Sequence, residues 1–366
     1  MKKEEILLTK DVINSVPKVL LHDHLDGGLR PETIIDLADD LHYKKLPTHD
    51  KDELANWFYV GANKGSLVEF LKGFEHTTAV MQTKEGLERV AYEMMEDMKA
   101  DGVVYVETRF APVYHTNKDM YHEDTVTAVL KGLEKGKNDF GVDYGLILCG
   151  MRNMNNTLEI AELAVNFRND GVVGFDLAGE EGGYPPKKHI DAFQFIQRSN
   201  FNITIHAGEA FGKESIWQAI QWCGAHRIGH ATRLLEDIVL NDNDEVVSYG
   251  ELAQYVLDKR IPLEICLLSN LHTGAVDKLE NHPFGVLFKD KFRVTINTDD
   301  RLMSATNMTQ EFLIAAKYFN INFDEMEKIT INSMKSAFIP YKERLQFIYN
   351  IIKPGYQKIR NKLFKN

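Results

Sequence analysis

Residues 19–24 read VLLHDH, an apolar run that passes directly into ionisable side chains. Such a run is typical of a buried strand whose carboxyl end opens into a site. His22 and His24 lie two residues apart on this expected strand, so their side chains point to the same side, about 6.6 Å apart by strand rise. A lone inward histidine is more often a core residue, but two neighbouring imidazoles are a natural start for a metal site.

Runs of the same kind recur along the chain. Strands are expected at residues 19–24, 102–110, 143–151, 172–177, 202–207, 227–230, 261–269 and 292–298. Amphipathic stretches lie between most of them, such as 157–169, whose apolar residues fall at i, i+3, i+4 and i+7. Eight strands that alternate with helices predict an α/β fold, a closed (β/α)₈ barrel of the TIM type. An open doubly wound sheet is the alternative, but no glycine-rich dinucleotide fingerprint follows the first strand.

Two segments exceed what a minimal barrel needs. Residues 31–100 are longer than one crossover helix, which predicts several extra helices between the first two strands. Residues 342–366 are amphipathic and rich in Lys and Arg, which predicts a C-terminal surface helix with a solvated basic face, or less readily a partner or membrane surface. No Pro/Gly/Ser-rich linker divides the chain, so residues 1–366 are expected to form one domain.

Composition narrows the class of protein. A net charge of −11, from 43 Lys+Arg and 54 Asp+Glu, disfavours nucleic acid and anionic membranes as main partners. The three cysteines, Cys149, Cys223 and Cys266, are widely spaced, which indicates neither a disulfide framework nor a thiolate zinc site. No apolar stretch approaches the roughly 20 residues of a membrane helix, and no cleavage-like signal opens the chain. These features predict a protein of the reducing cytoplasm and leave its oligomeric state open.

Ionisable residues gather at the ends of the expected strands. The fifth strand ends in HAGE with His206, and the eighth ends in NTDD with Asp299. Because active-site residues of such barrels come from the carboxyl ends of strands, these side chains are expected to meet His22 and His24. Imidazole and carboxylate ligands suit zinc, and a spare coordination position can hold water.

Three neighbouring residues complete the predicted site. Glu209 lies three residues past His206 and can reach the metal's surroundings as a proton shuttle, or else caps the next helix. His230, at the end of the sixth strand, is a candidate fourth nitrogen ligand or base. Asp300 diverges from Asp299 on an extended chain, so it can face a ligand. The remaining nine histidines, His42 and His272 among them, are expected to be surface or capping residues.

Taken together, these segments resemble the adenosine deaminase family of the amidohydrolase superfamily. The matching segments are HDHLDGGLRPETI, VETRFAP, DLAGEE, HAGE, GH and NTDD, in the family's order between residues 22 and 300. SLVEFLKGF also resembles the family's hydrophobic lid helix, although its stripe of Leu67, Phe70, Leu71 and Phe74 equally fits a core-facing helix.

The resemblance implies a zinc-dependent hydrolysis of adenosine and 2′-deoxyadenosine to inosine and 2′-deoxyinosine, with release of ammonia. It implies one zinc per chain, because no bridging lysine follows the fourth strand, and these ligands: His22, His24, His206 and Asp299. It makes Glu209 the proton donor to purine N1, while His230 orients the zinc-bound water and assists its deprotonation. The residues that it places against the substrate are His24, Asp26 (ribose 5′-hydroxyl), the Gly179 amide (N3) and Asp300 (N7).

Other interpretations stay open. The family usually has proline where Leu267 and Arg301 stand and glycine where Ala231 stands, and Arg301 could attract an anion such as phosphate. A sibling deaminase could act on adenine, AMP or a modified nucleoside. Asp26 resembles the adenosine branch, and only Arg30 lies close enough to the first strand to hold a phosphate. A catalytically dead barrel that binds purine or a protein partner is a further alternative.

Overall fold

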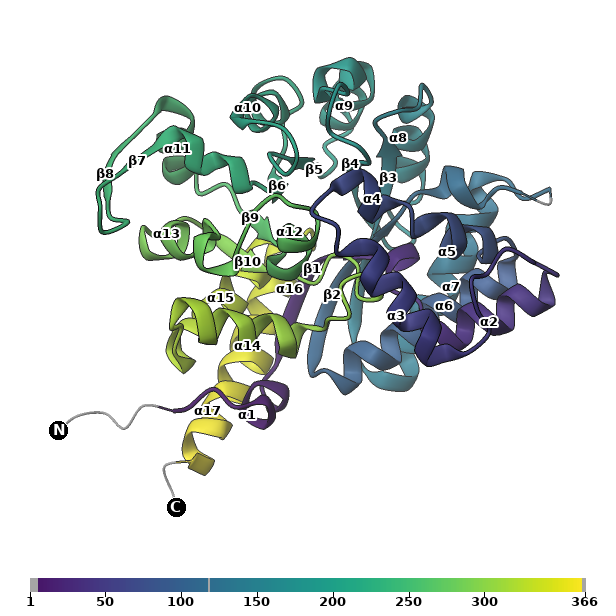
Figure 1. Cartoon of the computed structure of the whole chain (residues 1–366), viewed down its shortest axis with the longest axis horizontal. Coiled ribbons are helices and arrows are strands. Elements are labelled where there is room, and N and C mark those ends of the chain that lie inside the picture. The colour runs from purple at the N-terminus through teal and green to yellow at the C-terminus, as the bar shows by residue number, and fades with distance from the viewer. Residues whose placement is uncertain (1–5, 118, 364–366) are drawn as a thin grey trace.

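The computed structural model describes residues 6–117 and 119–363, and a ring of parallel strands lies at its centre (Figure 1). The first sheet has the order β1 (Lys18–His24), β2 (Val103–Phe110), β3 (Asp143–Met151) and β4 (Val172–Ala178). The second has the order β10 (Val294–Ile296), β9 (Leu263–Ile265), β6 (Arg227–His230) and β5 (Thr204–Ala207). Parallel bridges between Asp23 and Asp299 and between Phe175 and Ile203 join the two sheets. The predicted closed (β/α)₈ barrel is confirmed.

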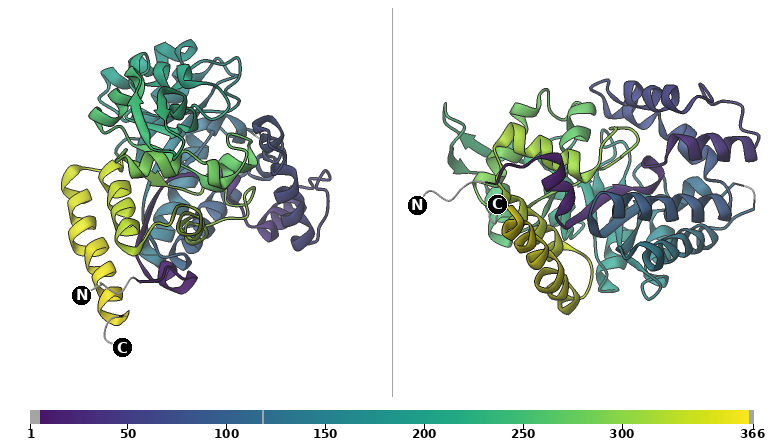
Figure 2. Two further views of the ribbon diagram at one scale, coloured as in Figure 1. Left: turned by 60° about the vertical axis from the view of Figure 1, so that its left-hand side comes forward. Right: turned by 90° about the horizontal axis from the view of Figure 1, so that it is seen from below.

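Helices surround the barrel, and an extra group of them follows the first strand. The group between β1 and β2 comprises α2 (Pro31–Asp40), α3 (Lys51–Ala62), α4 (Leu67–Leu71), α5 (Phe74–Val80) and α6 (Lys84–Ala100), as the length of this segment predicts. Figures 1 and 2 show these helices together on one side of the molecule. The other helices up to the last strand are α1 (Lys10–Ser15), α7 (His122–Phe140), α8 (Thr157–Asn166), α9 (Ile190–Arg198), α10 (Lys213–Gln221), α11 (Glu251–Lys259), α12 (Leu267–His272) and α13 (Phe284–Lys289).

Two local expectations were wrong. Residues 267–269 were expected to continue a strand, but β9 ends at Ile265 and these residues open α12. A short apolar run does not distinguish a strand from a buried helix, and here the amide of Leu267 donates to the buried Glu311 carboxylate at 3.1 Å. The hairpin of β7 (Ile238–Leu240) and β8 (Val246–Tyr249), which projects from the barrel in Figure 1, was not expected at all.

The C-terminal helices lie on the surface of the barrel, and the last of them is attached through one buried side chain. After α14 (Met308–Phe319) and α15 (Phe323–Ser336) come α16 (Tyr341–Gln346), a π-helical turn (Phe347–Ile352) and α17 (Lys353–Leu363). Tyr356 is fully buried and its hydroxyl hydrogen-bonds Thr330 of α15 at 2.9 Å. The predicted amphipathic helix is therefore confirmed up to residue 363, and residues 364–366 lie outside the described part. No helix within residues 6–117 or 119–363 has the length and apolar character needed to cross a membrane.

Candidate active site

Four buried side chains converge where the two sheets meet at the carboxyl end of the barrel. His22 and His24 come from β1, His206 from β5, and Asp299 from the turn after β10. The Nε2 atoms of His24 and His206 are 3.1 Å apart, and Asp299 Oδ1 lies 3.0 Å from His22 Nε2 and 3.4 Å from His24 Nε2. One potential ligand atom from each residue lies within 4.8 Å of all the others, so this group could hold a metal ion.

Carboxylates behind the histidines fix which nitrogen faces the cluster. Glu264 accepts from His22 Nδ1 at 2.8 Å, and Asp176 accepts from His206 Nδ1 at 3.0 Å. The Nε2 atoms of His22 and His206 therefore carry free lone pairs that can bind a metal ion. A tetrahedral metal with metal–nitrogen bonds of about 2.0–2.1 Å, as zinc has, sets neighbouring nitrogens about 3.3 Å apart. The donor set and its spacing fit such a metal, and His22 Nε2 has no other hydrogen-bond partner.

Two buried arginines neutralise these supporting carboxylates. Arg109 of β2 lies 3.1 Å from Asp176 and 3.0 Å from Glu264, and Arg227 also pairs with Glu264, at 2.5 Å. Burial opposes ionisation of Glu264, but the two arginines hold the pKa of its carboxyl well below the usual range. Sequence reasoning missed this network. Its signal was the presence of charged residues in the middle of otherwise apolar strands, such as Arg109 in VETRF.

Glu209 is held beside the cluster by a second glutamate. The carboxylate of Glu181 accepts the backbone N–H groups of Gly208, Glu209, Ala210 and Phe211 at 2.7–3.0 Å. Glu209 Oε2 lies 3.6 Å from His230 Nε2, and its Oε1 is buried without a partner among the described residues. Burial, together with the charges of Asp299 and Glu181, raises the pKa of Glu209 well above its usual value. The surroundings of Glu209 thus favour the protonated form of its carboxyl group.

A chain of hydrogen bonds determines the tautomer of His230. The Phe284 amide donates to His282 Nδ1 at 3.0 Å, so the proton of His282 lies on Nε2, 3.1 Å from Asn270 Oδ1. The amide group of Asn270 therefore donates to His230 Nδ1, at 2.9 Å. Burial lowers the pKa of His230 well below its usual value, so the ring is neutral. Its remaining N–H, on Nε2, points toward Glu209 and the metal cluster as a donor.

Asp300 points away from the metal cluster, as the divergence of adjacent side chains predicts. Its Oδ1 is buried without a partner, and it occupies the space where any side chain at Gly27 would stand. Burial, followed by the negative charges of Asp299 and Asp26, raises the pKa of Asp300 well above its usual value. Asp26 also has a buried, unpartnered Oδ1, while its Oδ2 lies 3.4 Å from His115 Nε2.

A cavity of about 440 Å³ leads from the cluster to the surface. His24 and Asp26 lie at its inner end, and Gly179, with a left-handed φ of 98° that favours glycine, lines one wall. Leu71 and Phe74 of the expected lid segment line the opposite wall, whereas Phe70 is buried in the core. The helix breaks between Leu71, the end of α4, and Phe74, the start of α5. The segment therefore contributes both to the core and to the pocket wall.

This geometry agrees with comparisons to known proteins. A family model described as adenosine deaminase matches residues 17–354. The chain belongs to the adenosine deaminase family. Adenosine deaminase 1 of Streptomyces coelicolor is 51% identical to it over 356 residues, which cover 96% of this chain and 90% of that protein. Membership makes the chain a hydrolytic deaminase on an amidohydrolase barrel.

Solved structures with the same fold are named for, or were solved with, different purine compounds. Adenine deaminase from Arthrobacter aurescens has a TM-score of 0.82 at 26% identity, with 92% of this chain and 98% of that chain covered. The arabidopsis protein ADAL, solved in complex with IMP, has a TM-score of 0.80 at 26% identity, with 94% and 98% covered. The family assignment therefore leaves the choice of purine to the residues around the pocket.

Of two departures from the adenosine deaminase pattern, Ala231 has a conformational cost and Leu267 has a structural reason. Ala231 takes a left-handed backbone with φ 54°, next to His230 with φ 65°. Glycine adopts this conformation freely, whereas alanine has a cost of roughly 1–2 kcal/mol. Leu267 uses its amide to bind Glu311, a bond that proline could not make.

Arg301, which was suggested to attract an anion, pairs with two carboxylates, while its Nη2 is buried without a partner among the described residues. Its Nε donates to the buried Asp23 at 2.7 Å and its Nη1 lies 3.4 Å from Asp97, so the positive charge already has partners. It also does not line the cavity. Arg301 forms a structural ion pair with Asp23 of β1. Asp23 is fully buried and stands in sequence between His22 and His24 of the metal cluster.

Replacing Arg301 by methionine is therefore expected to destabilise the protein by about 3–5 kcal/mol, because Asp23 is left buried without a counter-charge. Denaturant unfolding measures this change. The double variant with Asp23→Asn should recover much of the loss, because no unpaired charge then remains. A loss below about 1 kcal/mol for Arg301→Met alone would show that the pair contributes as little as a surface salt bridge.

Several histidines assigned to the surface from sequence are buried. His42 is exposed as expected, but the structure buries four others: His115, His189, His272 and His282. Each has a hydrogen-bond partner, and three of them, His115, His189 and His272, are the last residues of short helical elements. His115 beside Asp26 and His282 behind Asn270 thus belong to the surroundings of the site.

Proposed function

We propose that the chain hydrolyses adenosine and 2′-deoxyadenosine to the corresponding inosines and ammonia, with one zinc ion per chain. The observation that carries the proposal is a set of buried oxygen atoms without protein partners, one each on Glu209, Asp300 and Asp26, around a cluster suited to a metal. A folded protein rarely leaves such atoms unpaired unless a ligand completes them. The adenosine deaminase relative, 51% identical, supports the same substrate.

His22, His24, His206 and Asp299 would hold the zinc. When bound, zinc lowers the pKa of a water so that hydroxide is available near neutral pH. Asp176 and Glu264 keep two of the histidines in the tautomer that can bind it. A second metal would need a bridging ligand such as a carboxylated lysine, and β4 (VVGFDLA) contains no lysine.

The other residues of the site protonate the purine, stabilise charge on the attacking oxygen or bind the substrate through hydrogen bonds. Glu209, protonated in its buried position, donates a proton to N1 as the water oxygen adds to C6. The Nε2–H of His230 orients the attacking water and stabilises the negative charge on its oxygen. Because Nε2 already carries a proton, the help with deprotonation that the resemblance implied is not assigned to His230. Asp300 donates a hydrogen bond to N7, the Gly179 amide donates to N3, and Asp26 accepts the 5′-hydroxyl of the ribose. The C6–N bond then breaks as the added hydroxyl loses its proton and becomes the C6 carbonyl, and the amino group takes up one proton and leaves as ammonia.

The proposed role of Asp26 predicts the choice of substrate. We expect a strong preference for adenosine and 2′-deoxyadenosine over adenine, because adenine would leave Asp26 Oδ1 buried and unpaired. AMP is also expected to be poor. Lys72, the one cation among the described residues lining the cavity, is paired with Glu69, and Arg30 is paired with Glu96 and Asp97. An ultraviolet assay of deamination measures kcat/KM for adenosine, 2′-deoxyadenosine, adenine and AMP. Comparable kcat/KM values on adenine and adenosine would refute the role proposed for Asp26.

The proposed role of Asp300 predicts a difference between two substitutions. Asp300→Asn keeps a hydrogen-bond donor toward N7, so it should retain appreciable affinity for a purine nucleoside inhibitor. Asp300→Ala removes the donor and should bind roughly 10–100-fold more weakly than the asparagine variant. Titration calorimetry with the metal-loaded proteins measures both affinities. Equally poor binding by the two variants would make Asp300 a support for the metal cluster instead.

A further inference from the structure

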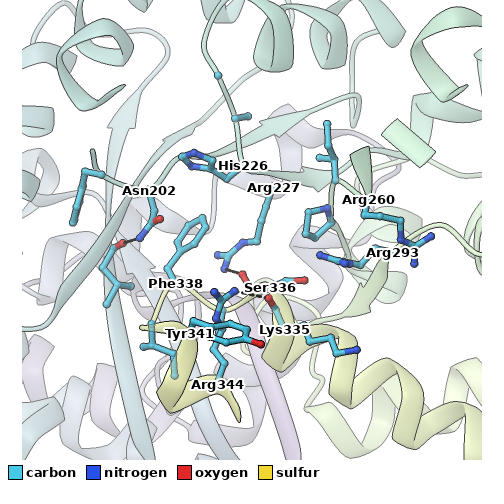
Figure 3. Close-up of a pocket in the computed structure, with 18 of the residues that line it drawn as sticks. Asn202, His226, Arg227, Arg260, Arg293, Lys335, Ser336, Phe338, Tyr341 and Arg344 are labelled. Carbon is cyan, nitrogen blue, oxygen red and sulfur yellow. Dashed lines mark hydrogen bonds between the residues drawn. The ribbon is translucent and has the colours of Figure 1, made fainter. Parts of the chain in front are cut away.

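A second cavity, of about 900 Å³, opens at the end of the barrel opposite the active site. Its walls come from the amino ends of strands, including Val172 of β4, Arg227 of β6 and Arg293 just before β10, and from the loop and helix at residues 335–344. His206 and His230 lie at the other ends of β5 and β6. The barrel wall therefore separates this cavity from the metal cluster, and Figure 3 shows its side chains.

The described lining of this cavity has a strong excess of positive charge. It contains seven cationic side chains and no carboxylate, although the whole chain carries a net charge of −11. The seven are Arg168, Arg227, Lys259, Arg260, Arg293, Lys335 and Arg344. Within the described residues only Arg227 of these has a carboxylate partner. A concave surface of one charge sign concentrates ions of the opposite sign.

Three half-buried arginines, Arg260, Arg293 and Arg344, line this cavity without a carboxylate partner among the described residues. Burial, and then the charges of Arg260 and Arg344, lowers the pKa of Arg293. The Nε atoms of Arg293 and Arg344 are buried and make no hydrogen bond in the described structure. The hydrogen bonds that Arg260 and Arg344 do make go to backbone carbonyls, of Lys291 and Lys335. Positive charges that share one concave surface repel one another, and an anion bound between them removes this destabilisation.

The floor of the cavity offers further donors. Arg227 is 1% exposed, and its Nη2 has no hydrogen-bond partner among the described residues. His226 accepts the Ile203 amide at Nδ1, so its Nε2 carries the proton and remains a donor. The ring of Phe338 lies 3.6 Å from the Arg227 guanidinium and keeps it in place. Buried donors without acceptors indicate a missing ligand that supplies oxygen atoms.

We propose that this cavity binds a multiply charged phosphate compound, either a nucleotide or a polyphosphate. Guanidinium groups match phosphate oxygens two at a time, and an unpaired set of them is the usual recognition surface for phosphate groups. The cavity volume exceeds what a single phosphate needs. The inference does not depend on the reaction at the other end of the barrel, because the two sites share no residue.

Calorimetric titration of the metal-loaded protein with tripolyphosphate tests the proposal. Tripolyphosphate contains no purine, and a saturating purine nucleoside inhibitor keeps the active site occupied. The double variant Arg293→Gln/Arg344→Gln should bind at least tenfold more weakly than the unmodified protein. Arg89→Gln is the control, because Arg89 lies on α6 and pairs with Glu93 and Asp36 outside the cavity. It should leave the affinity unchanged.

A parallel titration with ATP separates the two sources of phosphate. Tighter binding of ATP than of tripolyphosphate would identify a nucleotide, and equal binding would identify the phosphate chain as the recognised part. Absence of saturable binding at millimolar tripolyphosphate would overturn the proposal. So would an equal loss of affinity in Arg89→Gln and in the double variant, because binding would then follow net charge alone. Thermal unfolding confirms that each variant is folded.

Discussion

His22→Ala is expected to lose bound metal and turnover together. His22 supplies one of four ligand atoms, and its Nε2 lies 3.0 Å from Asp299 with no other partner. Removing it also leaves Glu264 facing an empty space inside the barrel, which weakens the position of the remaining ligands. Asp299→Ala should behave in the same way, because it removes the one anionic ligand and leaves the three imidazoles uncompensated.

Elemental analysis together with an ultraviolet assay checks this result. The unmodified protein should contain about one zinc per chain, and His22→Ala close to none. His49→Ala is the matched control, because His49 is half-exposed and its Nδ1 lies 3.5 Å from Asp39, away from the barrel. Two tightly bound metals per chain, or full activity without metal, would contradict the mononuclear proposal.

Glu209→Gln is expected to keep the metal and lose turnover by about 10²–10⁴-fold, the usual contribution of a proton-transferring group. Glutamine has the same shape as glutamate. The four hydrogen bonds that the backbone N–H groups of residues 208–211 donate to Glu181 are therefore undisturbed. What glutamine lacks is a carboxyl proton to give to N1. Burial and the nearby charges of Asp299 and Glu181 raise the pKa of Glu209, so the native side chain holds that proton.

The control for this variant is Glu214→Gln on α10, an exposed glutamate five residues further along the chain. Its turnover and metal content should match those of the unmodified protein. Glu209 could either protonate the purine or only shape the pocket, and the affinity for a purine nucleoside inhibitor distinguishes these two roles. A near-normal kcat for Glu209→Gln with zinc bound would mean that another group protonates the purine, and Glu209 would then only shape the pocket.

The sequence by itself determined the barrel and the position of its reactive face. Strands buried on both sides read as apolar runs, and the barrel places all their carboxyl ends together, so HDH, HAGE, GH and NTDD had to meet. The strand ends alone therefore predict one cluster of His22, His24, His206, His230 and Asp299. This reasoning was less reliable at short apolar runs, and it assigned residues 267–269 of helix α12 to a strand.

Only the tertiary structure decided what holds these side chains in place. Glu264 and His22 are 242 residues apart, and nothing local marks the glutamate as the partner of that histidine. Nothing local marks Asn270 and His282 as the residues that fix the tautomer of His230, or Asp23 as the ion-pair partner of Arg301. Periodicity reports which face of an element is buried, whereas pairing depends on which elements the closed barrel brings into contact. The cationic cavity has the same origin. Its arginines come from β6, α16, the segments after α8 and α11, and the residue before β10, and they line one cavity only when the strands close into a ring.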